Sequence, residues 1–284
     1  MDSCVPELAT VAQALAHARL VGVDQLDAQL LLVQQLGRPR TWLLANDDAP
    51  VTDSPALLAL LGRRAAGEPL AYLIGKREFH GLLLHVTPDV LVPRPDTETL
   101  VDWALELLAG PLAAHTAPQV VDLGTGSGAI ALAVKSACPR AFVHAVERSP
   151  AALAVAQDNA LRLGLEVHWH LGNWWGGVCG QRFDLVLSNP PYVAPGDPHL
   201  SALAYEPVSA LVPQDDPGKG LADIERIVAG AQAHVVERGW MLLEHGADQA
   251  LEVRELMHRS NFRHPCTRRD LAGQPRTTGA RWRG

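Results

Sequence analysis

The residues best suited to chemistry in this chain are Asn189, Pro190, Pro191 and Tyr192, which follow the apolar run 183–187. The run predicts a buried strand, and two prolines must end it because proline lacks a backbone donor and has a fixed φ. Asn189 is therefore expected at the carboxyl end of a strand, where open α/β sheets bind ligands. We interpret the stretch as a pocket that presents a planar amide or amine to a methyl donor.

A second candidate site is the stretch 122–128, Asp-Leu-Gly-Thr-Gly-Ser-Gly, between an apolar run and a helical pattern. Glycines allow a sharp turn and the close approach of a ligand, and a helix N-terminus favours a carboxylate or phosphate. Glu147 ends the next apolar run about 20 residues later, where an acid can accept both hydroxyls of a ribose. Nicotinamide dinucleotide and S-adenosylmethionine both fit this pattern. The loop residues expected to contact the cofactor are Gly124, Thr125, Gly126, Ser127 and Gly128.

The Asn-Pro-Pro-Tyr stretch favours S-adenosylmethionine, because a dehydrogenase has no need of it after its fourth strand. An amide nitrogen is a poor nucleophile, so its orientation matters. If Asn189 Oδ1 and the Pro190 carbonyl each accept one N–H, the lone pair points at the methyl group, and such orientation contributes about 7 kcal/mol at best. Tyr192 can stack on the planar group and favour the sulfonium cation. We expect catalytic roles for Asn189, Pro190 and Tyr192, with Asn189 also next to the cofactor.

The elements that position these residues alternate from residue 119 onward, which predicts an α/β fold with a mostly parallel sheet and helices on both faces. Expected strands are 120–123, 141–146, 167–171, 183–187 and 240–244, and expected helices are 126–137, 150–163, 221–236 and 248–260. The last stretch, 263–283, is weakly patterned and could supply antiparallel edge strands.

The preceding residues divide into two segments. Residues 1–75 show only helical patterns, with Asp27 and Ser54 as candidate N-caps and Gly37 as a helix stop. This segment is either a stability domain or a docking surface for a macromolecule. Residues 76–92 predict a β-hairpin linker, and residues 93–284 form the α/β domain.

The stretch 93–98, Pro-Arg-Pro-Asp-Thr-Glu, opens a helix that runs through Leu108, with Asp96 or Thr97 as its cap. Arg94, between two prolines, is rigidly presented. It is either a surface charge or a contact near the cofactor pocket.

Composition excludes several classes. The 284 residues carry a formal net charge of −7, which argues against broad nucleic-acid binding. The four cysteines show no metal-ligand spacing and fit a reducing compartment. We expect no metal site, no membrane span and no signal peptide at the N-terminus, and hence a cytoplasmic protein.

Taken together, these residues resemble the bacterial release factor glutamine methyltransferase family. The resemblance rests on the stretches 68–75, 79–81, 92–98, 122–130 and 188–192. It implies a class I S-adenosylmethionine-dependent methyltransferase with a Rossmann-like, mostly parallel seven-stranded sheet and a small helical N-terminal domain that docks the substrate. It also implies methylation of the glutamine in the Gly-Gly-Gln motif of class 1 peptide release factors, which modulates translation termination.

Carried over by position, the family implies cofactor contacts at 124–128, Glu147 and Trp174, and a glutamine held by 189–192. Glu147 stands where the family often has Asp, and Asn173 stands where an acid is common. Trp175 is adjacent to Trp174 and either ring could pack on adenine. Only the resemblance favours Trp174.

Three rival functions remain open. An adenine-N6 methyltransferase acting on DNA or RNA would share the pocket, but the base must be extruded into it, and a basic groove is expected. A binding module that lost turnover would have no need of Asn189 and Glu147. A dehydrogenase is the third.

Overall fold

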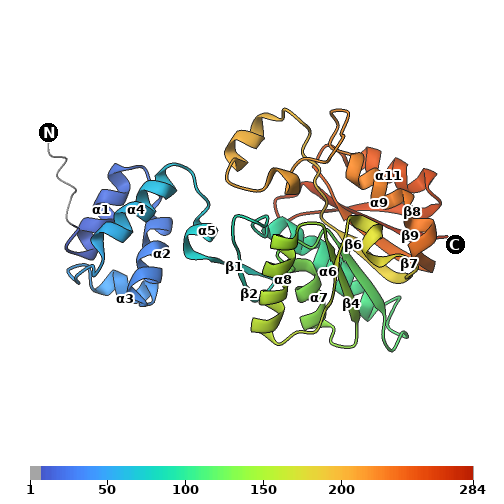
Figure 1. Cartoon of the computed structure of the whole chain (residues 1–284), viewed down its shortest axis with the longest axis horizontal. Coiled ribbons are helices and arrows are strands. Elements are labelled where there is room, and N and C mark those ends of the chain that lie inside the picture. Colours follow the sequence, from blue (N-terminus) through green and yellow to red (C-terminus); the bar gives the residue numbers. More distant parts are fainter. Residues whose placement is uncertain (1–7, 284) are drawn as a thin grey trace. The chain divides into compact units, whose positions relative to one another are not determined.

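The computed structural model of the chain describes residues 8–283. These form two compact units, residues 8–76 and residues 77–283, each with its own core (Figure 1). The expected absence of a signal peptide concerns residues that lie largely outside the described ones. No helix within residues 8–283 is long and apolar enough to cross a membrane. No group of three or more metal-ligating side chains in this range could hold a metal ion.

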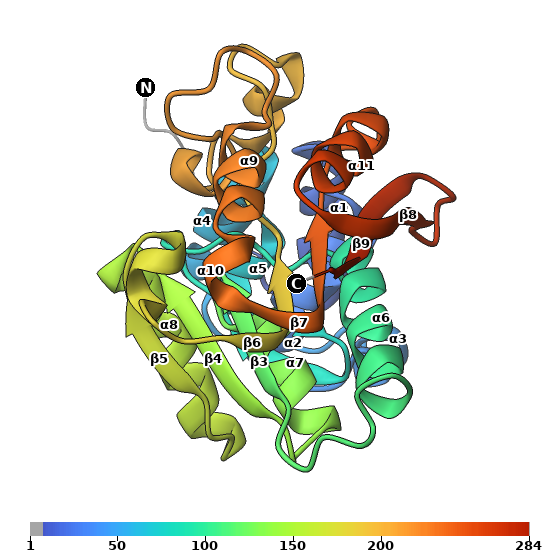
Figure 2. The same cartoon turned by 90° about the vertical axis from the view of Figure 1, so that its right-hand side faces the viewer.

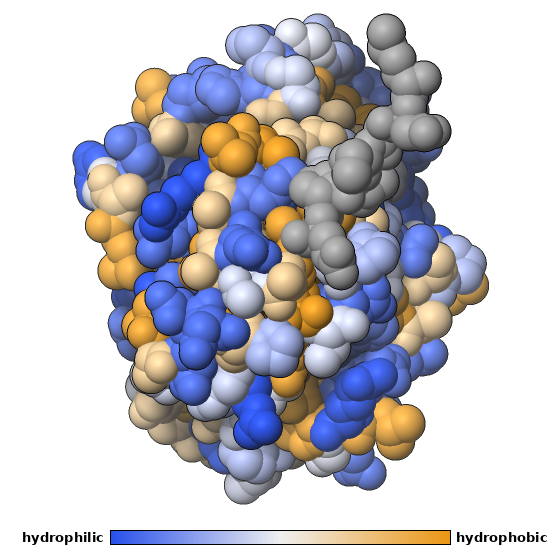
Figure 3. Space-filling view, turned by 90° about the vertical axis from the view of Figure 1, so that its left-hand side faces the viewer, coloured by the Kyte–Doolittle hydropathy of each residue, from blue (hydrophilic) through white to orange (hydrophobic). Residues whose placement is uncertain are grey.

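The N-terminal unit is built of helices around one apolar core. Its helices are α1 (Val11–Leu20), α2 (Gln25–Leu36), α3 (Arg40–Ala45), α4 (Ser54–Ala65) and α5 (Leu70–Ile74). Several large apolar side chains remain exposed on it: Leu20, Val21, Leu26 and Leu44. Figure 3 shows one face of the molecule, on which hydrophobic and hydrophilic residues are interspersed.

Two predicted caps in this unit are wrong by a few residues. Asp24, not Asp27, caps α2, since its Oδ1 accepts the Leu26 N–H at 2.8 Å. Asp53, not Ser54, caps α4, and the Ser54 hydroxyl accepts a bond from another part of the chain instead. In both cases another acceptor stands within three residues upstream of the predicted one, and short local patterns do not choose between nearby acceptors.

A β-hairpin made of β1 (Lys76–Phe79) and β2 (Leu82–His85) follows the helices. Its two turn residues, His80 and Gly81, both have positive φ, 48° and 77°. This is the backbone that a tight two-residue hairpin loop needs. The His80 N–H also donates to the Glu98 carboxylate at 3.1 Å, which ties the turn to the helix that begins there.

The second unit is the α/β domain. Its helices are α6 (Glu98–Ala109), α7 (Ala129–Ala137), α8 (Pro150–Leu163), α9 (Ala222–Ala229), α10 (Ala231–His234) and α11 (Ala250–Arg259). Its strands are β3 (Gln119–Leu123), β4 (Phe142–Glu147), β5 (His168–Leu171), β6 (Phe183–Ser188), β7 (Val235–Glu244), β8 (Phe262–Arg269) and β9 (Pro275–Trp282). Short 3₁₀ turns are η1 (Pro95–Thr97), η2 (Trp174–Val178), η3 (Pro198–Leu203) and η4 (Val208–Ala210).

The seven strands form one sheet in the order β5-β4-β3-β6-β7-β9-β8. The first five are parallel, and β9 pairs antiparallel with both β7 and β8. One apolar layer packs α6 and α7 on the sheet, and another packs α9 and α11 on the opposite face. Figure 2 shows helices on both sides of the sheet. The predicted mostly parallel seven-stranded fold is confirmed, and 263–283 supply the antiparallel edge.

The order in which strands are added to the sheet reverses between β3 and β6. Strands β3, β4 and β5 run outward on one side, and β6 and β7 follow on the other. The carboxyl ends of β3 and β6 therefore meet at the topological switch point, where sheets of this type bind ligands. The Ser188 hydroxyl donates to the Leu123 carbonyl at 2.6 Å and ties the two strand ends together.

Two predicted helices have wrong boundaries. Helix α7 begins at Ala129, not at Gly126, because Gly126 and Gly128 have positive φ, 56° and 83°. The predicted helix 221–236 divides into α9 and α10, and its last residues join β7, where Val235 pairs with Phe183. Thr97, one of the two predicted caps, stands at the N-cap position of α6, but its side chain makes no capping hydrogen bond.

Candidate functional site

A cavity opens at the switch point between the glycine loop and Asn189. It is lined by residues from the hairpin, η1, the ends of β4 and β6, and the loop after β5. The residues of its wall that the argument uses are Arg94, Thr97, Gly124, Thr125, Gly126, Ser127, Glu147, Trp174 and Asn189. All the predicted cofactor contacts except Gly128 are in this wall, which we call the first cavity.

Gly128, the last residue of the glycine loop, does not line the first cavity. A Cβ on Gly128 would come 3.0 Å from Leu132 and 3.3 Å from Ala156, so the glycine permits close packing of α7 and α8. Its predicted cofactor contact has no support in the wall of the cavity.

Asp122 fixes the shape of the glycine loop. Its Oδ2 accepts the Thr125 hydroxyl at 2.5 Å, while Oδ1 has no hydrogen-bond partner among the described residues. Burial raises the pKa of Asp122 to about 7, against the lowering effect of the Thr125 hydrogen bond. Such a carboxyl at the base of the loop suits a cationic or hydrogen-bonding ligand group. The sequence signal was available, since Asp122 opens the motif.

Glu147 ends β4 beside the loop. Its Oε2 accepts the Gly126 N–H and its Oε1 accepts the Ser149 N–H, both at 2.9 Å. These bonds hold the carboxylate in the cavity wall with lone pairs left for further donors. Glu147 therefore presents a carboxylate in the wall of the first cavity.

The structure separates the two adjacent tryptophans. Trp174 lines the first cavity and packs so closely on the loop that a Cβ on Gly124 would lie 2.9 Å from its ring. Trp174 has a φ of 47°, which is rare for a bulky residue and typical of functional sites. Trp175 instead donates to the Ile227 carbonyl and stacks on His234 with ring centroids 4.6 Å apart.

A second cavity lies on the other side of Asn189. Its wall includes Arg94, Asn189, Pro190, Tyr192 and Glu244, together with apolar residues of the segment after Tyr192. Pro191 lines the first cavity instead. Asn189 therefore belongs to the wall of both cavities.

Arg94 also borders both cavities. It forms an ion pair with Glu206, a buried carboxylate whose other oxygen accepts the Val92 N–H at 3.0 Å. Glu206 belongs to the segment 193–211, whose ends are joined by the Val193 N–H and the Leu211 carbonyl. Arg94 therefore anchors this segment at the second cavity. Of the two predicted alternatives for Arg94, a surface charge or a contact near the pocket, the structure has the contact.

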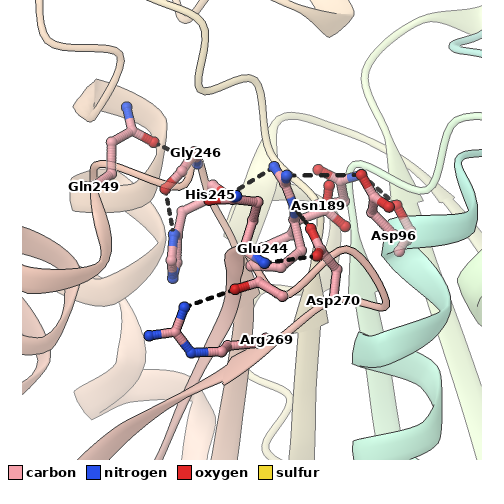
Figure 4. Close-up of polar contacts among 12 residues, drawn as sticks. Asp96, Asn189, Glu244, His245, Gly246, Gln249, Arg269 and Asp270 are labelled. Carbon is pink, nitrogen blue, oxygen red and sulfur yellow. Dashed lines mark hydrogen bonds and ion pairs between the residues drawn. The ribbon is translucent and has the colours of Figure 1, made fainter.

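A polar cluster lies behind Asn189. Thr97 accepts the Asn189 Nδ2–H at 3.2 Å, and the Tyr192 hydroxyl donates to Glu244 Oε1 at 3.2 Å. Figure 4 shows Asn189 and Glu244 in the same polar region as Asp96, His245 and Asp270, which contact Arg276 through their carboxylates or, for His245, its carbonyl. The Thr97 and Glu244 contacts were missed from the sequence, although Glu244 ends a predicted strand at the ligand edge of the sheet.

The chain matches two family models. Residues 8–75 match the "PrmC N-terminal domain" and residues 97–205 match the "Methyltransferase small domain". A curated relative from Bordetella pertussis, named release factor glutamine methyltransferase, is 48% identical over 91% of this chain and 95% of that protein. Relatives of the same name from Burkholderia pseudomallei and Escherichia coli are 46% and 41% identical, over 100% and 95% of this chain and 100% and 96% of those proteins.

Two solved structures are similar in fold to most of the chain at low sequence identity. A 16S rRNA N2 G1207 methyltransferase of T. Thermophilus aligns with a TM-score of 0.56 and 21% identity, over 73% of this chain and 50% of that chain. The catalytic domain of hMettl16 aligns with a TM-score of 0.55 and 16% identity, over 79% of this chain and 81% of that chain. At these identities the likeness concerns the fold alone.

Proposed function

The chain belongs to the release factor glutamine methyltransferase family, and on that premise we propose the reaction it performs. It transfers a methyl group from S-adenosyl-L-methionine to the side-chain amide nitrogen of the glutamine in the Gly-Gly-Gln motif of class 1 peptide chain release factors. The observation that carries this proposal is the position of Asn189 between two cavities, one walled by the glycine loop and Glu147 and one by Pro190 and Tyr192.

The first cavity fits S-adenosylmethionine. Glu147 would accept the ribose hydroxyls, and Trp174, whose ring packs against Gly124 where a Cβ would stand, would pack on the adenine. The unpartnered Oδ1 of Asp122 offers a buried acceptor toward the methionyl ammonium, directly or through one water. When bound, S-adenosylmethionine supplies an electrophilic methyl group on a sulfonium.

The second cavity would take the acceptor glutamine. Asn189 Oδ1 and the Pro190 carbonyl each accept one amide N–H, which turns the nitrogen lone pair toward the first cavity. The ring of Tyr192 would stack on the face of the planar amide. Because burial raises the pKa of Tyr192, with the Glu244 charge acting in the same direction, its hydroxyl stays protonated and serves as a donor.

These residues act by orientation rather than by strong base catalysis. Holding the nitrogen in line with the methyl group replaces a rare encounter by a bound geometry, which lowers the barrier by about 7 kcal/mol at best. The amide proton is acidic once the nitrogen is methylated and leaves to solvent. No charged base need face the nitrogen beforehand.

The N-terminal unit would hold the release factor. Its exposed apolar side chains, among them Leu20 and Leu26, give it surface that a protein partner could cover. Release factors work on ribosomes, so we place the protein in the cytoplasm and propose that its activity modulates translation termination. Sequence-specific nucleic-acid binding has no part in this proposal.

The test is methyl transfer from labelled S-adenosylmethionine to four acceptors: a class 1 release factor, the same factor with its Gly-Gly-Gln glutamine replaced, DNA and ribosomal RNA. The proposal expects label in the intact release factor alone. Label in nucleic acid and none in the release factor would instead favour an adenine-N6 methyltransferase.

A further inference from the structure

Both adjacent tryptophans are tied to helix α9 by their indole N–H groups. Trp174 Nε1 donates to Asp223 Oδ1 at 3.3 Å, and Trp175 Nε1 donates to the Ile227 carbonyl at 3.0 Å. Of the two rings, that of Trp174 lines the first cavity. Helix α9 therefore holds a ring of the cavity wall through one side chain, that of Asp223.

The position of the Trp174 ring depends on contacts from outside its own turn. Its φ of 47° is strained for a bulky side chain. Gly176 and Gly177 follow in the same turn, η2, and have no side chains to pack around it. The ring packs against Gly124, where a Cβ would lie 2.9 Å away. Packing on a glycine leaves the ring free to turn in its plane, whereas a directed hydrogen bond to Asp223 fixes it.

Asp223 is itself rigidly held. Its side chain is buried, and its Oδ1 also accepts from Arg226, three residues further along α9, at 2.8 Å. Its Oδ2 has no hydrogen-bond partner among the described residues. A buried carboxylate with an unpartnered oxygen lowers stability. A contribution to folding is therefore a poor account of Asp223, and the contact with Trp174 is a better one.

We propose that Asp223 is a positioning residue for the cofactor. Its carboxylate fixes the indole of Trp174 in the orientation in which the ring packs on the adenine of S-adenosylmethionine. Asp223 does not line the first cavity, so it acts through Trp174. The inference rests on the proposed function, because that function makes S-adenosylmethionine the ligand of this cavity.

The experiment compares Asp223→Asn, which keeps an accepting oxygen, with Asp223→Leu, which removes it at a similar size. Asp223→Leu should raise the Kd for S-adenosylmethionine, measured by calorimetry, on the order of 10-fold, the equivalent of about one hydrogen bond. Asp223→Asn should retain most of the affinity. At saturating S-adenosylmethionine the kcat with a release factor should change little, because a contact with the adenine, remote from the methyl group, acts on ground state and transition state alike.

A double-mutant cycle separates positioning of Trp174 from a merely structural role in α9. Trp174→Phe removes the indole N–H that Asp223 accepts. Trp175→Phe is the matched control, because its N–H bonds to the backbone of the same helix. In the Trp174→Phe background, Asp223→Leu should change the Kd by less than about 2-fold. In the Trp175→Phe background the loss of about 10-fold should persist.

Wild-type affinity in folded Asp223→Leu overturns the inference, as do equal losses in Asp223→Asn and Asp223→Leu. Equal losses from Asp223→Leu in the Trp174→Phe and Trp175→Phe backgrounds also overturn it. If Asp223→Leu fails to fold, Asp223→Ala takes its place in the same cycle.

The proposed function fails in a different way. Wild-type protein that binds S-adenosylmethionine without methylating a release factor contradicts the proposed acceptor and leaves this inference standing. Wild-type protein that does not bind S-adenosylmethionine contradicts both.

Discussion

Replacing Gly220 by alanine should displace the backbone of Tyr192, which lines the second cavity. Gly220 precedes α9 and has a φ of 70°. A Cβ at this position would lie 2.1 Å from the Tyr192 carbonyl oxygen and 2.9 Å from Gln249 Nε2. Gln249 Nε2 donates to that same carbonyl at 3.0 Å, so the added carbon meets the contact that fixes the backbone of Tyr192.

The magnitude follows from two contributions. An alanine in the left-handed region costs about 1–2 kcal/mol, and relief of an overpacked contact costs a further 1–3 kcal/mol, roughly. Real Cβ atoms keep at least 3.0 Å, so the Tyr192 backbone must move by about 1 Å, a displacement that can lower a rate on the order of 100-fold. We therefore expect a large fall in kcat with little change in the Kd for S-adenosylmethionine.

Gly180→Ala is the matched control. Gly180 has a φ of 77° and nothing within 4 Å of its added Cβ, so it carries the backbone cost without the contact. Denaturant unfolding and release factor methylation should be measured for both variants. Equal kcat values in Gly220→Ala and Gly180→Ala would refute the claim that the Tyr192 backbone position limits catalysis.

Two further predictions concern the first cavity. Glu147→Ala should weaken S-adenosylmethionine binding about 10- to 100-fold by calorimetry, because hydrogen bonds to a charged group contribute about 1.5–3 kcal/mol; unchanged affinity would exclude Glu147 from the ribose site. Asp122→Asn should flatten the pH dependence of stability. The folded pKa of Asp122 is raised to about 7, so its stabilisation is complete below about pH 4, the unfolded value, and is lost as the pH rises through 7. The wild-type free energy of unfolding should thus fall between about pH 4 and pH 7 by up to about 4 kcal/mol from this group, and an identical slope in Asp122→Asn would contradict the assignment.

The ligand edge of the sheet could be predicted because its signals are local. Two prolines after an apolar run place Asn189 at a strand end. The glycines before α7 likewise mark the turn at the end of β3. The alternation of strands and helices then brings both ends to one edge by topology. Nothing beyond short windows of sequence was needed for this part.

The contacts behind Asn189 depend on residues distant in the chain. Asp96 and Thr97 were the alternative helix caps, and Thr97 does stand at the N-cap position, but its hydroxyl accepts a hydrogen bond from Asn189, 92 residues away. Glu244 is further still, on β7, and its burial follows from the packing of β9 and η1 around it. Periodicity and capping rules carry no information on such pairs.

The wrong boundaries have a related cause. Most of the stretch 221–236 is helical, as its pattern predicts. Its last residues belong to β7 instead, because Val235 pairs with Phe183. Tertiary pairing overrides a local preference of a few tenths of a kcal/mol per residue, approximately. Trp174 and Trp175 could not be separated for the same reason, since only the fold decides which ring faces Gly124.

The central claim is that Asn189 presents the release factor glutamine to the methyl donor. It is tested most directly by peptide mass spectrometry of a release factor after incubation with wild-type protein or Asn189→Ala, with S-adenosylmethionine binding measured on both. The account predicts one added methyl group on the Gly-Gly-Gln glutamine with the wild type, and almost none with Asn189→Ala, which should retain most of its affinity for S-adenosylmethionine. Methylation of that glutamine by Asn189→Ala at the wild-type rate would contradict it.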